Sequence, residues 1–159
     1  MSSQNQITEN PFLKYSWKGL IIMGIIMVGE SFLQISSAFL GNNEFIENYT
    51  GVNWNQYAAA NPEMADYLLM IGLQFGVLLG TIGLFGCVIA WKGFKKHEKW
   101  AWYTMWLFPI SFGLISLIFF ASINNMLIAW VSSATFSLIT AIIILLPYKA
   151  FFPPTTTTS

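Results

Sequence analysis

The sequence predicts an all-α membrane protein: a four-transmembrane-helix bundle with both termini in the cytoplasm and a short interfacial helix in the outer loop. Of the 159 residues, 55% are hydrophobic and only 9% are charged. An ordinary soluble domain has about a quarter of its residues charged, so lipid must cover most of this surface. Long apolar segments follow one another along the chain, and every lysine falls on one side of them.

The apolar segments divide the chain into four spans. Residues 100–148 contain no charged side chain, and as one helix they would be about 73 Å long, far more than a hydrocarbon core of about 30 Å. This run therefore folds back at its polar break, Ser122–Asn125. We expect one transmembrane domain, 17–148, between cytoplasmic tails 1–16 and 149–159, with spans at about 17–40, 67–91, 100–120 and 126–146, an outer loop 41–66 and an inner loop 92–99.

We expect the first apolar segment, 17–40, to be a membrane anchor and not a cleaved signal peptide. It is longer than the apolar region of a usual signal peptide, and Glu30 and Gln34 interrupt it.

The lysines predict the orientation. They precede the first span, fill the loop between the second and third spans, and follow the fourth: Lys14, Lys18, Lys92, Lys95, Lys96, Lys99 and Lys149. The acidic residues of the outer loop, from Glu44 to Asp66, lie on the opposite side. Because lysines near span ends mark the cytoplasmic face, we expect a multi-pass protein of the cell membrane with both termini inside.

The outer loop carries helix signals. Asn53 and Gln56 have the spacing of a capping box, which predicts a short helix through Ala60. Asn61 and Pro62 then resemble an N-cap and a first-turn proline for the second span. Asn48 begins an Asn-Tyr-Thr tripeptide, a glycosylation acceptor pattern on the predicted outer side.

The first span contains a carboxylate, Glu30, roughly 20 Å from its inner end. Ionisable groups inside a membrane are costly and usually have a function and a partner. Gln34 lies one turn away, and Asp66 and Asn124 come from outer ends of other spans, so these four residues form a candidate intramembrane polar site. The alternative is a neutral Glu30 hydrogen-bonded to Gln34 or to a neighbouring helix, with a structural role only.

The second span contains a glycine stripe: Gly72, Gly76, Gly80 and Gly83. Such a stripe lets another helix approach closely. It predicts helix packing, within the chain or against another protein, with packing inside the chain favoured.

The loop before the third span is basic and runs into aromatic residues. Its candidate lipid-headgroup residues are Lys92, Lys95, Lys96, Lys99, Trp100 and Trp102. Lysines and tryptophans of this kind are also what ordinary membrane topology requires. Pro109 predicts a kink in the third span. His97 has no second histidine or cysteine nearby, so we expect no metal site and no cofactor, and the zero net charge favours no nucleic-acid partner.

Two segments resemble small, uncharacterised four-helix integral membrane proteins of bacteria and archaea. The matching residues are Thr50, Gly51, Trp54, Pro62 and Tyr67 in the first segment and Glu98, Lys99, Trp100, Ala101, Trp102 and Tyr103 in the second. The second set matches an E-[KR]-W-A-W-Y signature before the third span. The resemblance implies a four-helix membrane fold and no established activity.

The expected function is that of a small non-catalytic subunit that stabilises a larger membrane complex. Small size, short loops, the glycine stripe and the lack of a catalytic constellation favour it, and they would suit a respiratory or copper monooxygenase complex. The expected partners are membrane lipids and other membrane subunits or further copies of the chain. One alternative is an oligomeric transporter or channel that uses Glu30, and a second is a lipid- or quinone-binding membrane protein.

Overall fold

The computed structural model describes residues 11–43, 46–47, 51–122 and 127–153, and in these residues it contains helices and no β-strand. The helices are α2 (Pro11–Phe39), α4 (Trp54–Ala60), α5 (Pro62–Lys92), the 3-10 turn η1 (Phe94–Lys96), α6 (Lys99–Met105), α7 (Leu107–Ser122), α8 (Leu127–Leu145) and α9 (Tyr148–Phe151).

The long helices have the length and composition of membrane helices. Three stretches are long and apolar enough to cross a bilayer, Lys14–Phe39, Pro62–Lys96 and Lys99–Ala121, and Ala129–Leu145 is a shorter apolar helix. Large apolar side chains cover their outer faces, for example Phe85, Leu117 and Leu138, each more than 60% exposed. A soluble protein would not leave so much apolar surface in water. The helices therefore indicate a membrane protein.

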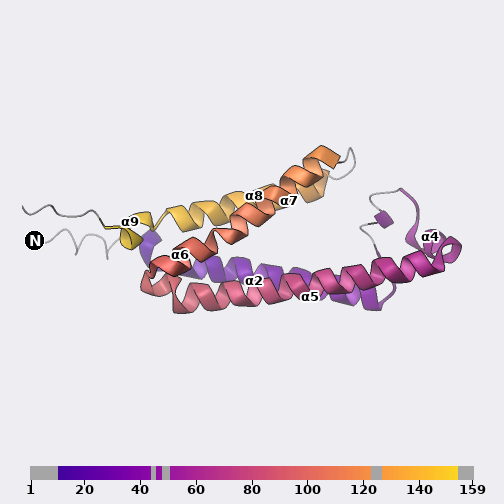
Figure 1. Ribbon diagram of the computed structural model, residues 1–159, viewed down its shortest axis with the longest axis horizontal. Helices are drawn as coiled ribbons and strands as arrows, with labels where there is room; N and C mark the ends of the chain where they lie inside the picture. Colours follow the sequence, from indigo (N-terminus) through magenta and orange to yellow (C-terminus); the bar gives the residue numbers. More distant parts are fainter. Residues whose placement is uncertain (1–10, 44–45, 48–50, 123–126, 154–159) are drawn as a thin grey trace, which may run out of the picture.

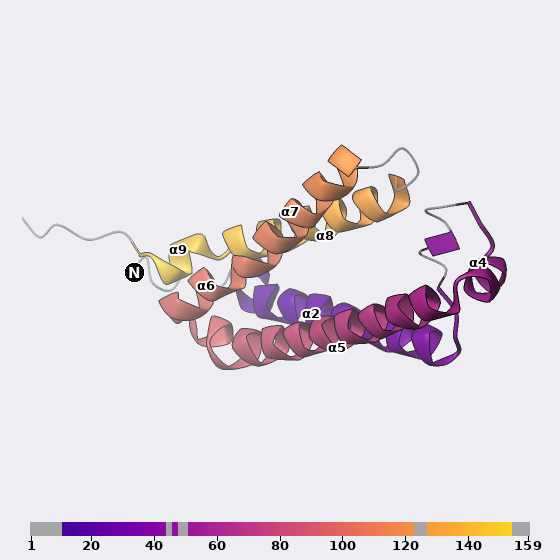
Figure 2. The ribbon, with the colours of Figure 1, turned by 45° about the vertical axis from the view of Figure 1, so that its right-hand side comes forward.

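The helices form two antiparallel hairpins. α2 packs along α5, and α7 packs along α8. In both views the hairpins lie close together at one end and diverge toward the other (Figures 1 and 2). We call the first the lysine end, because η1, the start of α2 and α9 lie there, and the second the α4 end.

The hydrophobic core lies at the lysine end, where both hairpins contribute to it. Its buried residues are Leu20, Met27, Ala90, Phe94, Ala101, Met105, Phe108, Ile144 and Phe151. The Phe94 and Phe151 rings lie 4.7 Å apart, joining η1 to α9. This core fixes the start of each hairpin relative to the other.

The α2–α5 hairpin is held by close backbone contact. A Cβ at Gly83 would lie only 2.7 Å from the carbonyl oxygen of Gly24, so the two helices cannot admit a side chain there without a shift. About two turns further along, the Ser31 hydroxyl donates to the carbonyl oxygen of Gly76 at 2.7 Å. In lipid, packing of this kind and hydrogen bonds between helices replace the hydrophobic effect as the source of association.

The third predicted span is two helices. α6 ends at Met105, and the Trp106 amide donates to Tyr103 in a tighter turn before α7 begins. Pro109 has no N–H to donate to Met105, and its ring crowds the preceding turn, so the predicted kink lies just before the proline.

Both helix signals of the predicted outer loop, at Asn53 and at Asn61–Pro62, coincide with the start of a helix in the structure. Asn53 caps α4, accepting a hydrogen bond from the amide of Asn55 at 3.1 Å. Asn61 stands at the N-cap position of α5, with Pro62 next to it, but its side chain does not cap the helix. The Asn61 amide group donates instead to the carbonyl oxygen of Tyr57.

The Gly24–Gly83 contact predicts the effect of a single methyl group. We expect Gly83→Ala to destabilise the protein by about 1–3 kcal/mol, because the new Cβ forces the two backbones apart. The matched control is Gly72→Ala on the same helix, where a Cβ would meet nothing within 4 Å. That control should be neutral or up to about 1 kcal/mol more stable. Unfolding midpoints in detergent measure both, and equal midpoints would contradict the packing argument.

Candidate functional site

Glu30 lies on α2 with its side chain exposed, and it makes no hydrogen bond or ion pair with another described residue. Gln34, one turn further on, is half-buried, and its Cβ lies near Gly76 of α5. The structure therefore does not pair the carboxyl group of Glu30 with the amide of Gln34.

Asp66, a third residue of the predicted polar site, does not lie beside Glu30. The Ser31–Gly76 hydrogen bond fixes the depth of Glu30 relative to α5. Asp66 is exposed and lies roughly 15 Å beyond Gly76 along that helix. Asn124 is outside the described residues. Among the described residues, Glu30 therefore has no second member of the predicted site beside its carboxyl group.

The helical register shows which way Glu30 faces. At the lysine end, the α2 face that carries Gly19 meets α8: a Cβ at Gly19 would lie 3.2 Å from Ile143. About three turns further along the same face comes Glu30, which is exposed. The equivalent distance along α8 from Ile143 leads to Ser132, also exposed. Glu30 therefore lies on the side of α2 that points toward the α7–α8 hairpin.

The faces of α5 and α7 that meet at the lysine end show the same change from packed to exposed along their length. A Cβ at Gly86 of α5 would lie 2.5 Å from the Phe108 ring of α7. About three turns further along this face, Phe75 is 47% exposed. Each face that joins the hairpins is thus packed at the lysine end and uncovered at the α4 end. We call these uncovered parts, with Glu30, Phe75 and Ser132, the divergent face.

The glycine stripe contacts more than one helix. Gly76, Gly80 and Gly83 lie against α2, and Gly86 lies against α7. A Cβ at Gly72 would meet nothing within 4 Å, so this glycine has no packing role in the described structure. Sequence reasoning did not identify Gly24, the partner of Gly83. The glycines of the first span, Gly19, Gly24 and Gly29, are five residues apart and point to different sides of a helix, so no stripe in the sequence marked Gly24.

The lysine end combines ammonium groups with aromatic rings. Lys18 and Lys95 come from different elements, and both lie over the Trp17 ring, 5.7 and 4.8 Å from its centroid. Lys92 lies over Trp91, and Lys99 over Phe152. Lys96 is exposed. These ammonium–ring contacts leave the lysines exposed, and they suit the boundary between headgroups and hydrocarbon.

Trp102 is the centre of the aromatic cluster at the lysine end. Its ring makes edge contacts with Tyr103, Trp106, Tyr148 and Phe152. Its Nε1 donates to the carbonyl oxygen of Ile144 at 3.1 Å, which ties α6 to α8. Trp100, in contrast, is half exposed and donates to the Glu98 carboxylate. Of the two predicted headgroup tryptophans, Trp100 is the more accessible to lipid.

The turn between η1 and α6 contains His97 in a left-handed backbone conformation, with φ of 58°. Its ring contacts the edge of Phe151. Loss of hydration beside this ring lowers the pKa of His97 below its ordinary value.

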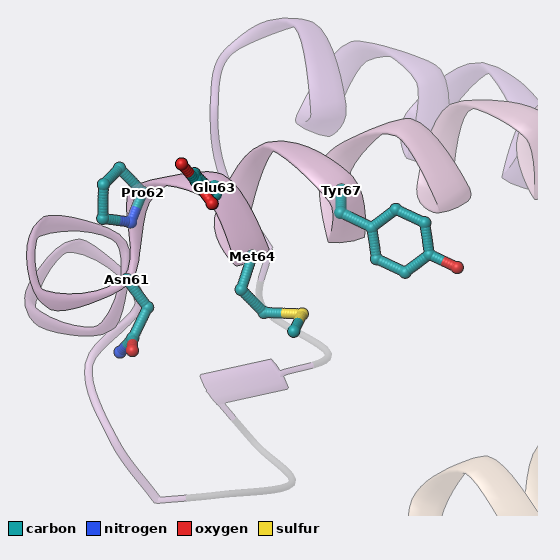
Figure 3. Close-up of a pocket in the computed structure, with 5 residues that line it drawn as sticks. All are labelled: Asn61, Pro62, Glu63, Met64 and Tyr67. Carbon is teal, nitrogen blue, oxygen red and sulfur yellow. The ribbon is translucent and has the colours of Figure 1, made fainter.

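The α4 end holds an open surface hollow of about 510 Å³. Figure 3 shows its five lining residues at the start of α5: Asn61, Pro62, Glu63, Met64 and Tyr67. Nearby, the indole of Trp54 is buried and donates to the Gly41 carbonyl oxygen at 2.6 Å, which anchors α4 over the α2–α5 hairpin. Glu63 is the only carboxylate among the five lining residues. Asn48, the glycosylation candidate, is outside the described residues.

Among the described residues, no group of three or more His, Cys, Asp or Glu side chains could hold a metal ion. Comparison with models of protein families, with curated proteins and with solved structures finds no match for the chain.

His97 predicts a pH dependence of stability. Its pKa is lowered by folding, so the unfolded chain binds the extra proton more readily, and stability falls as pH drops below about 6.5. In His97→Asn this contribution disappears, while asparagine tolerates the left-handed backbone. Unfolding midpoints of both proteins between pH 7.5 and 5 measure the difference. Parallel curves would show that His97 contributes nothing.

Proposed function

We propose that the chain is a non-catalytic subunit of a larger membrane complex, and that other membrane helices complete its packing. One observation carries this proposal: the faces that pack the hairpins together at the lysine end are uncovered at the α4 end. A chain that built its whole bundle alone would be expected to close these faces on each other. Lipid can cover apolar side chains such as Phe75, but it offers Glu30 no hydrogen-bond donor in the hydrocarbon.

The proposed topology has four crossings with both termini in the cytoplasm. α8 has 19 residues, which gives a length of about 28 Å, close to the thickness of the hydrocarbon core. All seven lysines lie in elements at the lysine end, which supports placing that end on the cytoplasmic side. α4 then lies over the outer ends of the α2–α5 hairpin.

A membrane-impermeant amine reagent tests the orientation. We expect Lys95 and Lys96, which are both exposed, to be modified only after the cells are opened. Mass spectrometry of the two lysines before and after lysis measures this. Modification in intact cells would reverse the proposed topology.

Native purification tests the subunit assignment. We expect the full chain, extracted from its own membranes in mild detergent, to migrate with other polypeptides in a fixed ratio. Blue native electrophoresis followed by quantitative mass spectrometry measures that ratio at several detergent concentrations. Migration of the chain by itself at every concentration would refute the proposal.

A further inference from the structure

The divergent face changes character along α2. Near the lysine end the face is apolar and packed, with Met23 and Met27 buried. Past that point Glu30 is exposed and Gln34 is half-buried. Figures 1 and 2 show the α7–α8 hairpin leaving α2 toward the α4 end. The polar part of the face therefore coincides with the part that the chain does not cover.

The described part of the chain supplies no donor for the Glu30 carboxyl. Ser132, at the same depth on α8, already donates to the carbonyl oxygen of Ala129 at 3.1 Å. The lysines are at the lysine end, roughly 20 Å from Glu30 along α2. A carboxyl group left without a donor in hydrocarbon is strongly disfavoured, so its donor must come from outside the described residues.

From these observations we infer that the divergent face receives one transmembrane helix of a partner protein, and that this helix carries a basic side chain at the depth of Glu30. The inference rests on the proposed subunit function and names the chemistry of its partner. A lipid acyl chain has no donor to offer. A second copy in the same orientation has its lysines at the wrong depth, and one in the opposite orientation would break the topology. Charge complementarity thus favours a different protein.

Matched substitutions in the full chain, in its own membranes, test the charge. We expect Glu30→Gln, which keeps the shape and removes the charge, to reduce the share of the chain found in the complex by about tenfold or more. Glu30→Ala should do the same. The control is Gln74→Ala, since Gln74 is an exposed polar residue of α5 on the side away from α2. It should leave the complex intact.

Each contrary result decides a separate point. If Glu30→Ala dissociates the complex and Glu30→Gln does not, a neutral hydrogen bond replaces the inferred cation and the inference fails. If neither variant changes the complex, the divergent face is not the docking face. If the isolated Glu30→Gln chain unfolds at a clearly lower temperature than the unmodified chain, Glu30 serves its own fold and the inference also fails. A wild-type chain that migrates alone refutes the proposed function itself.

Photocrosslinking tests the occupant directly. A photoreactive residue placed at Ser132 should capture an apolar peptide that contains Lys, Arg or His. The same residue placed at Leu138, which is 63% exposed on another side of α8, should not capture that peptide. A crosslink from Ser132 to a second copy of this chain, or equal capture at both positions, would overturn the inference.

Discussion

Close contact between the backbones of α2 and α5 is the constraint on which the rest of the structure depends. Gly24 and Gly83 bring the helices together, and the Ser31 hydroxyl fixes their register through Gly76. Because lipid provides little hydrophobic driving force between helices, such contacts must supply the association energy themselves. The register in turn determines that Glu30 points away from α5 and toward the other hairpin.

Different interactions hold the two ends of the molecule together. At the lysine end, large rings fill the space between hairpins, and Trp102 joins α6 to α8 through a hydrogen bond as well as ring contacts. At the α4 end, order comes from polar contacts near the surface, among them Trp54 with Gly41. Between these ends the hairpins separate, and the polar residues of α2 lie in that region. The buried core therefore lies at one end, and the exposed carboxyl group of Glu30 lies nearer the middle.

The helical class and the apolar segments could be predicted from the sequence because composition and hydropathy alone specify them. The cap at Asn53 and the kink near Pro109 were also predictable, since each depends on neighbouring residues. The direction of Glu30 was not, because it depends on how Gly24 and Gly83 meet, a contact between residues far apart in the chain. Proximity of Asp66 to Glu30 was assumed from their positions in adjacent spans, whereas the helix register separates them. The four-span topology and the function stay predictions.

The break in the helix at Trp106 allows α7 to pivot relative to α6. The short helix α6 stays bound to the core through Ala101 and Met105, while α7 extends about 24 Å from the break. A rotation of about 10° at this elbow would displace the far tip of α7 by about 4 Å, while the core residue Phe108, close to the break, would move by only about 0.5 Å. α8 ends beside the same core at Leu145, so a matching bend before α9 would let the two hairpins change their separation and fit neighbouring helices of different size.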